Sequence, residues 1–113
     1  MVKEKYTESE IKKIINSLAK TLTANHIAVD KIILYGSYAK GIPRPFSDID
    51  IAVISPDFKG KKIFEIQAIL ARLLSQYLSV AEMIGYSSDE FRTASPETFI
   101  GEIKRTGKIL YAA

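Results

Sequence analysis

The sequence predicts an α/β (α+β) fold in which helices cover a small mixed β-sheet. Stretches with apolar residues at helical spacing alternate with short, continuously apolar stretches typical of strands, in the order α-β-α-β-α-β-α-β. The chain has 113 residues, of which 47% are hydrophobic and 26% are charged, the balance of an ordinary globular protein. That length is enough for one domain, residues 1–113, and too short for two.

The expected elements follow one another at short spacing along the chain. They are a helix over 8–24, a strand over 31–35, a helical turn over 38–40, a strand over 47–55, a helix over 62–77, a strand over 80–86, a helix from 95 to 107, and an edge strand over 109–111. The first helix has Thr7 as its expected N-cap and lysines opposite its apolar side. Two prolines make residues 42–46 a loop.

The two later helices carry more specific expectations. The last helix begins with Ser95 as N-cap and Pro96 at the first helical position, and Phe99, Ile100 and Ile103 are expected to face inward. The helix over 62–77 has a wide apolar face, which either packs on the sheet or is shared with a partner. This face comprises Ile63, Ile66, Ile69, Leu70, Leu73, Leu74 and Tyr77.

Composition excludes several classes of function. The net charge of +3 is too small to support a nucleic-acid groove built on bulk charge. Because the chain has no cysteine and one histidine, disulfides, thiolate sites and a histidine-rich metal site are excluded. No apolar run approaches the roughly 20 residues that span a bilayer, and the charged N-terminus lacks a signal-peptide core. The expected location is the cytoplasm.

Gly36-Ser37 ends the first predicted strand just before a helical turn. Glycine lets the backbone bend sharply and lets a ligand approach closely. The amides that follow would point outward from a helix N-terminus, and the Ser37 hydroxyl would add a donor, so the pair is suited to a phosphate. The alternative is an ordinary strand-to-helix turn with serine as its cap.

Asp48-Ile49-Asp50 opens the second predicted strand. Because strand side chains alternate, both carboxylates project from one face about 7 Å apart, and Ile49, Ile51 and Val53 project into a core. Neighbouring carboxylates repel each other unless a cation lies between them, and Mg²⁺ is commonly held by one or two carboxylates plus substrate phosphates. The alternative is a solvated strand start. Together, the Gly-Ser turn and the two aspartates supply both halves of a nucleoside-triphosphate site.

These residues resemble a known signature. Gly36-Ser37, followed by a loop and by Ser47-Asp48-Ile49-Asp50-Ile51, is similar to the nucleotidyltransferase motif of the polymerase-beta-like superfamily. The chain's small size and its ending, residues 102–111, resemble the minimal nucleotidyltransferases (MNT), the antitoxin partners in HEPN/MNT toxin–antitoxin pairs. The resemblance implies the nucleotidyltransferase fold.

The resemblance also implies a role for each matching position. Gly36 and Ser37 would bind the nucleotide phosphates, and Asp48 and Asp50 would bind divalent metal. A third acidic residue on a later strand would be both ligand and base, and Glu82 is the acid within the predicted third strand. Family members usually carry aspartate there, and the longer glutamate puts the geometry of the metal site in doubt. The alternative for Glu82 is an edge-strand charge that blocks aggregation.

The function implied is Mg²⁺-dependent transfer of a nucleoside monophosphate, with ATP favoured as donor, to a hydroxyl acceptor. Two Mg²⁺ ions about 4 Å apart would stabilise the attacking and leaving oxygens. The implied acceptor is a side chain such as tyrosine on a HEPN-type toxin; neither nucleic acid nor membrane is an expected partner, and homo-oligomerisation stays open. Lys40 and Arg44 are candidates for neutralising phosphate charge. Two alternatives remain: an antitoxin that acts by occlusion with an unused site, and a regulator that binds nucleotide without transferring it.

Overall fold

A computed structural model describes residues 6–42 and 48–113. A four-stranded sheet has the order β3-β2-β1-β4. β1 (Lys31–Tyr35) pairs antiparallel with both β2 (Ile49–Ser55) and β4 (Lys108–Ala112), and β2 pairs parallel with β3 (Ala81–Ser87). The sheet is therefore mixed, as the sequence predicts.

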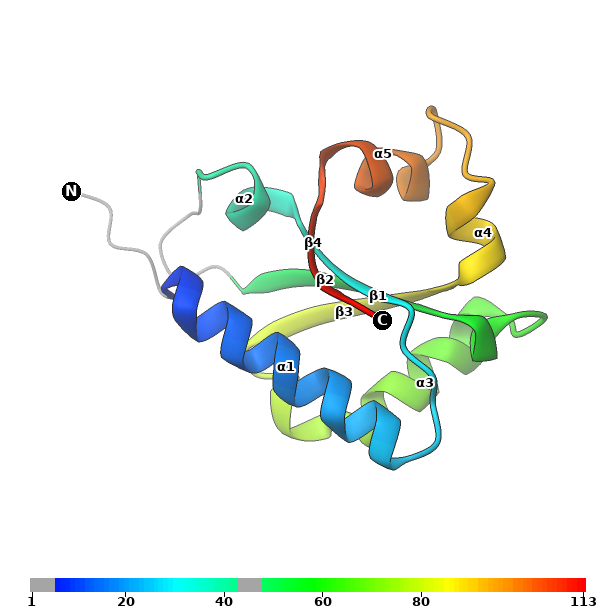
Figure 1. The fold of residues 1–113 in the computed structure, drawn as a ribbon, viewed down its shortest axis with the longest axis horizontal. Helices are drawn as coiled ribbons and strands as arrows, with labels where there is room; N and C mark the ends of the chain where they lie inside the picture. Colours follow the sequence, from blue (N-terminus) through cyan, green and yellow to red (C-terminus); the bar gives the residue numbers. More distant parts are fainter. Residues whose placement is uncertain (1–5, 43–47) are drawn as a thin grey trace.

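Helices cover both faces of the sheet (Figure 1). α1 (Glu8–Ala24) and α3 (Ile63–Leu73) lie on one face, where Ile51 and Val53 of β2 join the larger apolar core. α4 (Ser88–Arg92) and α5 (Phe99–Thr106) lie on the other face, over a smaller core. That smaller core comprises Ile33, Ala52, Ile54, Phe91 and Ile103.

Several elements match the sequence-based expectation closely. α1 has the expected bounds, and Thr7 caps it by accepting a hydrogen bond from the Glu10 amide. β1 also has its expected bounds, and α2 (Gly36–Ala39) begins two residues before the expected helical turn. β4 confirms the predicted edge strand. The loop containing Arg44, and Ser47 as a strand start, lie outside the described residues.

The region after β2 departs from expectation. The chain forms a 3₁₀ turn, η1 (Pro56–Phe58), and α3 then ends at Leu73, with a second 3₁₀ turn, η2 (Ser75–Tyr77), in place of the expected last helical turn. Ile66, Leu70 and Leu74 are buried, but Ile63 is 60% exposed at the first residue of α3. The apolar face of this segment is thus narrower than its spacing suggests.

The region after β3 also departs from expectation. α4 was not predicted, because five residues are too short to show a helical period. α5 begins three residues later than Ser95 would place it, and its N-cap is Thr98, whose hydroxyl accepts from the Gly101 amide. Ile103 is buried as expected, but Phe99 is 53% exposed, so its inward placement was wrong. Within the described ranges, no helix is both long and apolar enough to cross a membrane.

Candidate active site

Three polar side chains form a row across one end of the sheet. Tyr35, the last residue of β1, pairs with Asp50 of β2, and Asp50 pairs with Glu82 of β3. Residues paired across neighbouring strands project from the same face, and neighbouring strands lie about 4.8 Å apart. The row therefore brings two carboxylates and a phenol together on the face that α4 and α5 cover. We call it the Tyr35–Asp50–Glu82 row.

Gly36 directly follows Tyr35 in the chain and lies against the Asp50 carboxylate. Its backbone has a φ of 74°, a conformation that side chains other than glycine rarely adopt. A Cβ added at Gly36 would also collide with Oδ2 of Asp50. Glycine is thus required both by the turn from β1 into α2 and by the close approach of the Asp50 carboxylate. The phosphate-binding candidate and the carboxylate candidate are in direct contact.

The surroundings of the row favour the protonated forms of Tyr35 and Asp50. The pKa of Asp50 is raised to about 6, first by partial burial and then by the charge of Glu82, a hydrogen bond with Glu82 and the charge of Asp48. Burial raises the pKa of Tyr35 to about 12, with the Asp50 charge as the next cause. Tyr35 is therefore a protonated hydrogen-bond donor at neutral pH.

The remaining predicted site residues, Asp48 and Ser37, are close in sequence to the row, and Glu82 forms its outer end. Asp48 is half-buried and precedes β2 rather than opening it, yet its charge acts on Asp50. Ser37 is the second residue of α2, where the first amides of a helix have no intrahelical partner. Glu82 is exposed on β3, one of the two edge strands of the sheet, as expected for an acid flanked by apolar strand residues.

The donor chemistry of this site suits a hard divalent cation. All three acidic side chains offer oxygen, and the charges of Glu82 and Asp48 both act to raise the pKa of Asp50, as expected for neighbouring carboxylates. Among the described residues, no three acidic or histidine side chains are grouped closely enough to form a complete metal site. Mg²⁺ usually completes its shell with water and substrate phosphates, so these side chains supply at most part of such a shell.

In the described part of the chain, two hollows lie near α2. A recess of about 150 Å³ extends from Tyr35, Gly36 and Lys40 to the facing side of α5. Sequence reasoning missed this recess because Phe99, which lines it, was expected to be buried. The available signal in the sequence was the spacing of Phe99 and Glu102, which places an aromatic and an acidic side chain on one side of the last helix.

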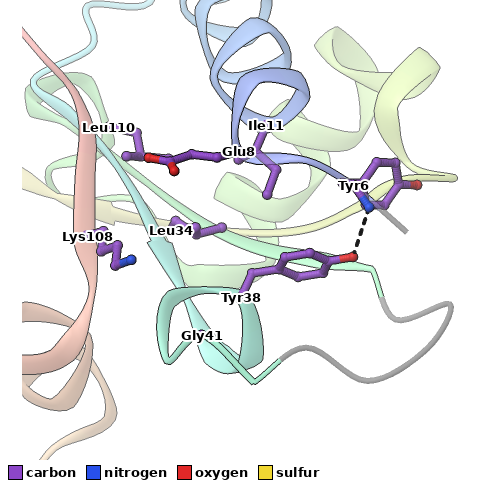
Figure 2. Close-up of a pocket in the computed structure, with 8 residues that line it drawn as sticks. All are labelled: Tyr6, Glu8, Ile11, Leu34, Tyr38, Gly41, Lys108 and Leu110. Atoms are coloured by element: carbon purple, nitrogen blue, oxygen red, sulfur yellow. Dashed lines mark hydrogen bonds between the residues drawn. The ribbon is translucent and has the colours of Figure 1, made fainter. Parts of the chain in front are cut away.

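The second hollow, of about 180 Å³, lies between the start of α1, α2 and β4 (Figure 2). Leu34 and Ile11, both members of the larger core, line it, and the Tyr6 amide donates to the Tyr38 hydroxyl at its edge. Because Leu34 and Tyr35 project from opposite faces of β1, this hollow is separate from the Tyr35–Asp50–Glu82 row.

Comparison with known proteins identifies relatives along nearly the whole chain. Two proteins of Methanocaldococcus jannaschii, both provisionally assigned as protein adenylyltransferases, are similar in sequence. One is 40% identical over 72 residues, covering 61% of this chain and 80% of its own. The other is 30% identical over 104 residues, covering 92% and 97%.

Solved structures share the fold. A provisionally assigned nucleotidyltransferase from Sulfolobus solfataricus has a TM-score of 0.61 at 17% identity, over 90% of this chain and 77% of the other. A toxin–antitoxin structure with AMP-PNP has a TM-score of 0.55 at 24% identity, over 90% and 73%. Residues 12–113 match the family described as polymerase beta, nucleotidyltransferase. The chain therefore belongs to the polymerase-beta nucleotidyltransferase family.

Proposed function

We propose that this nucleotidyltransferase transfers AMP from ATP to a hydroxyl group on a partner protein, with Mg²⁺ as cofactor. The observation that carries the proposal is the pairing of Asp50 with Glu82 directly against the Gly36 turn. The M. jannaschii relatives, provisionally assigned as protein adenylyltransferases, support the choice of donor and acceptor. The fold shared with the AMP-PNP-bound toxin–antitoxin structure, and the resemblance to MNT proteins, support an antitoxin whose partner is a HEPN-type toxin.

In this proposal the chain's residues divide the work between binding and proton transfer. Asp48, Asp50 and Glu82 would supply the protein's ligands to the cation, which when bound would neutralise charge on the triphosphate and the departing pyrophosphate. The Gly36 backbone leaves room for the phosphates, and the Ser37 hydroxyl and the first amides of α2 donate to their oxygens.

The reaction needs a base near the acceptor. The acceptor oxygen attacks the α-phosphorus, a new phosphorus–oxygen bond forms, and the bond to pyrophosphate breaks. Glu82 receives the acceptor's proton, because it is exposed beside Asp50 and reachable from outside the sheet. Tyr35 stays protonated and can donate a hydrogen bond to a developing negative charge.

The test is transfer to the co-expressed partner. Wild-type chain mixed with the partner, ATP and Mg²⁺ is expected to increase the partner's mass by one AMP unit or a multiple of it, measured by intact-protein mass spectrometry. Asp50→Asn and Glu82→Gln are each expected to lower the rate at least about a hundredfold, because each removes a charged group from the reacting centre. Asp89→Asn is the control, since this carboxylate forms surface ion pairs with Lys59 and Arg92 and is not part of the Tyr35–Asp50–Glu82 row.

Two observations favour the second candidate, an antitoxin that neutralises its partner by occlusion. Glu82 stands where the resemblance leads one to expect aspartate, and the described residues contain no complete metal site. Under that function, Asp50→Asn and a chelator would leave partner inhibition unchanged, and no AMP would be found on the partner. Inhibition that requires both Asp50 and ATP would exclude occlusion as the main activity.

A further inference from the structure

The recess between α2 and α5 adjoins the proposed phosphate site. Tyr35, Gly36 and Lys40 form one wall, and Phe99, Glu102, Ile103 and Thr106 form the other. The α5 residues recur at intervals of three and four, so they share one side of that helix. Because Gly36 also touches the Asp50 carboxylate, the recess begins one residue away from the reacting centre.

The size of the recess limits what it can hold. Its volume is about 150 Å³. Pockets that enclose a whole drug-sized ligand are larger, about 300–1,000 Å³. The recess therefore accommodates one ring system of a larger ligand. A nucleotide could place its base in the recess and its triphosphate outside.

The recess has a cationic end and an aromatic end. Lys40 lines the recess one helical turn after Gly36, so a positively charged residue belongs to the wall nearest the proposed phosphate site. At the other end, the rings of Phe99 and Tyr35 meet edge to face, with centroids 5.7 Å apart and an interplanar angle of 87°. Phe99 remains 53% exposed, so part of its ring is open to a further partner.

We propose that this recess is the nucleobase subsite, in which the base stacks on Phe99 and Glu102 accepts a hydrogen bond from its exocyclic amine. This inference rests on the proposed function, because it assigns a position to the base of the same ATP. Stacking on an aromatic ring is tolerant of sequence and suits any base. A carboxylate accepts only from N–H or O–H groups, so Glu102 favours adenine over bases that present a carbonyl at that position.

The first test separates base binding from phosphate binding. Two probes are titrated in Mg²⁺ by calorimetry: a non-hydrolysable ATP analogue and inorganic tripolyphosphate, which has no base. Phe99→Ala is expected to weaken the analogue about tenfold and leave tripolyphosphate unchanged, since aromatic stacking contributes on this order per base. Phe99→Trp is expected to restore the affinity.

Phe64→Ala is the matched control, because Phe64 is 66% exposed on α3, on the opposite face of the sheet. It is expected to change neither affinity. If Phe99→Ala leaves the affinity for the analogue unchanged, or weakens tripolyphosphate equally, the subsite is wrongly assigned. If it raises only the KM for the partner protein, the recess holds an acceptor side chain instead. A wild-type chain that binds neither probe would overturn the proposed function itself.

The second test concerns the exocyclic amine. Inosine triphosphate carries a carbonyl oxygen where ATP carries this amine. Wild-type chain is expected to prefer ATP about tenfold, the effect of one hydrogen bond to a charged group. Glu102→Ala is expected to reduce that preference to less than about threefold by removing the acceptor. If Glu102→Ala prefers ATP over inosine triphosphate as strongly as wild-type chain does, Glu102 does not bind the amine. The stacking role of Phe99 is decided separately, by the first test.

Discussion

At the scale of the residue, Gly36 is constrained by two independent effects. Its φ of 74° penalises any side chain, and a Cβ there meets the Asp50 carboxylate. Gly60 separates these effects, because its φ is 77° but a Cβ added to it would meet nothing within 4 Å. Comparing substitutions at Gly36 and Gly60 therefore separates the cost of backbone strain from the cost of the clash with Asp50.

Replacing Gly36 by alanine is expected to cost more stability than replacing Gly60. Gly60→Ala should lower the free energy of unfolding by about 1–2 kcal/mol from backbone strain alone. Gly36→Ala should lower it by roughly 1–3 kcal/mol more, because Asp50 must move. Denaturant unfolding measures both changes. AMP transfer should disappear in Gly36→Ala and persist in Gly60→Ala, and equal behaviour of the two variants would argue against the contact.

At the scale of the element, α5 shows how local signals compete. Ser95-Pro96-Glu97 has the form of a helix start, yet the helix begins after Thr98. The Thr98 side chain both donates to the Ser95 carbonyl and accepts from the Gly101 amide. A tight turn over residues 95–98 thus precedes the helix and delays its first residue to Phe99.

The position of this cap can be measured by mutation. Thr98→Ala is expected to lower the free energy of unfolding by about 1 kcal/mol, because it removes the acceptor for the first turn. Ser95→Ala should change it by less than about 0.5 kcal/mol, since the turn uses the Ser95 carbonyl rather than a cap hydroxyl. Thermal unfolding of the two variants measures which substitution costs more stability. A larger loss in Ser95→Ala than in Thr98→Ala would indicate that Ser95 is the N-cap.

Elements with strong local signals were predictable, and those fixed by tertiary contacts were not. α1 was predicted to the residue, because an amphipathic stripe and a capping box agree. α4 is too short to carry a period, and the exposure of Phe99 depends on how α5 lies over β1. The aspartates follow from strand alternation, but the pairing of Asp50 with Glu82 depends on the crossover through α3. No local pattern encodes that register, so only the family resemblance pointed to Glu82.

At the scale of the whole molecule, the site lowers the stability of the metal-free fold at neutral pH. Folding raises the pKa of Asp50 from 3.8 to about 6, so the folded state favours the protonated side chain. The contribution of Asp50 to stability is therefore fully present below pH 3.8 and is lost as pH rises through about 6. The Asp50 side chain therefore stabilises the fold when a proton or a cation offsets its charge, and not when it is ionised without one.

This linkage predicts a pH-dependent difference between wild-type chain and Asp50→Asn. Without metal, the two should be equally stable near pH 4, and Asp50→Asn should be more stable by about 1 kcal/mol at pH 8, after allowance for solvent screening. Mg²⁺ at pH 8 should raise the Tm of wild-type chain and leave that of Asp50→Asn nearly unchanged. Parallel pH profiles in EDTA would show that Asp50 is not under electrostatic strain.

The position of β3 at an edge of the sheet affects how large an acceptor the enzyme can modify. Glu82 lies at the rim of the sheet rather than at the bottom of a tunnel. A hydroxyl on the surface of a folded macromolecule can approach that rim sideways, without unwinding and without entering the enzyme. The size of an acceptor is then no barrier to its modification, and selectivity would have to come from the shape of both surfaces around the point of contact.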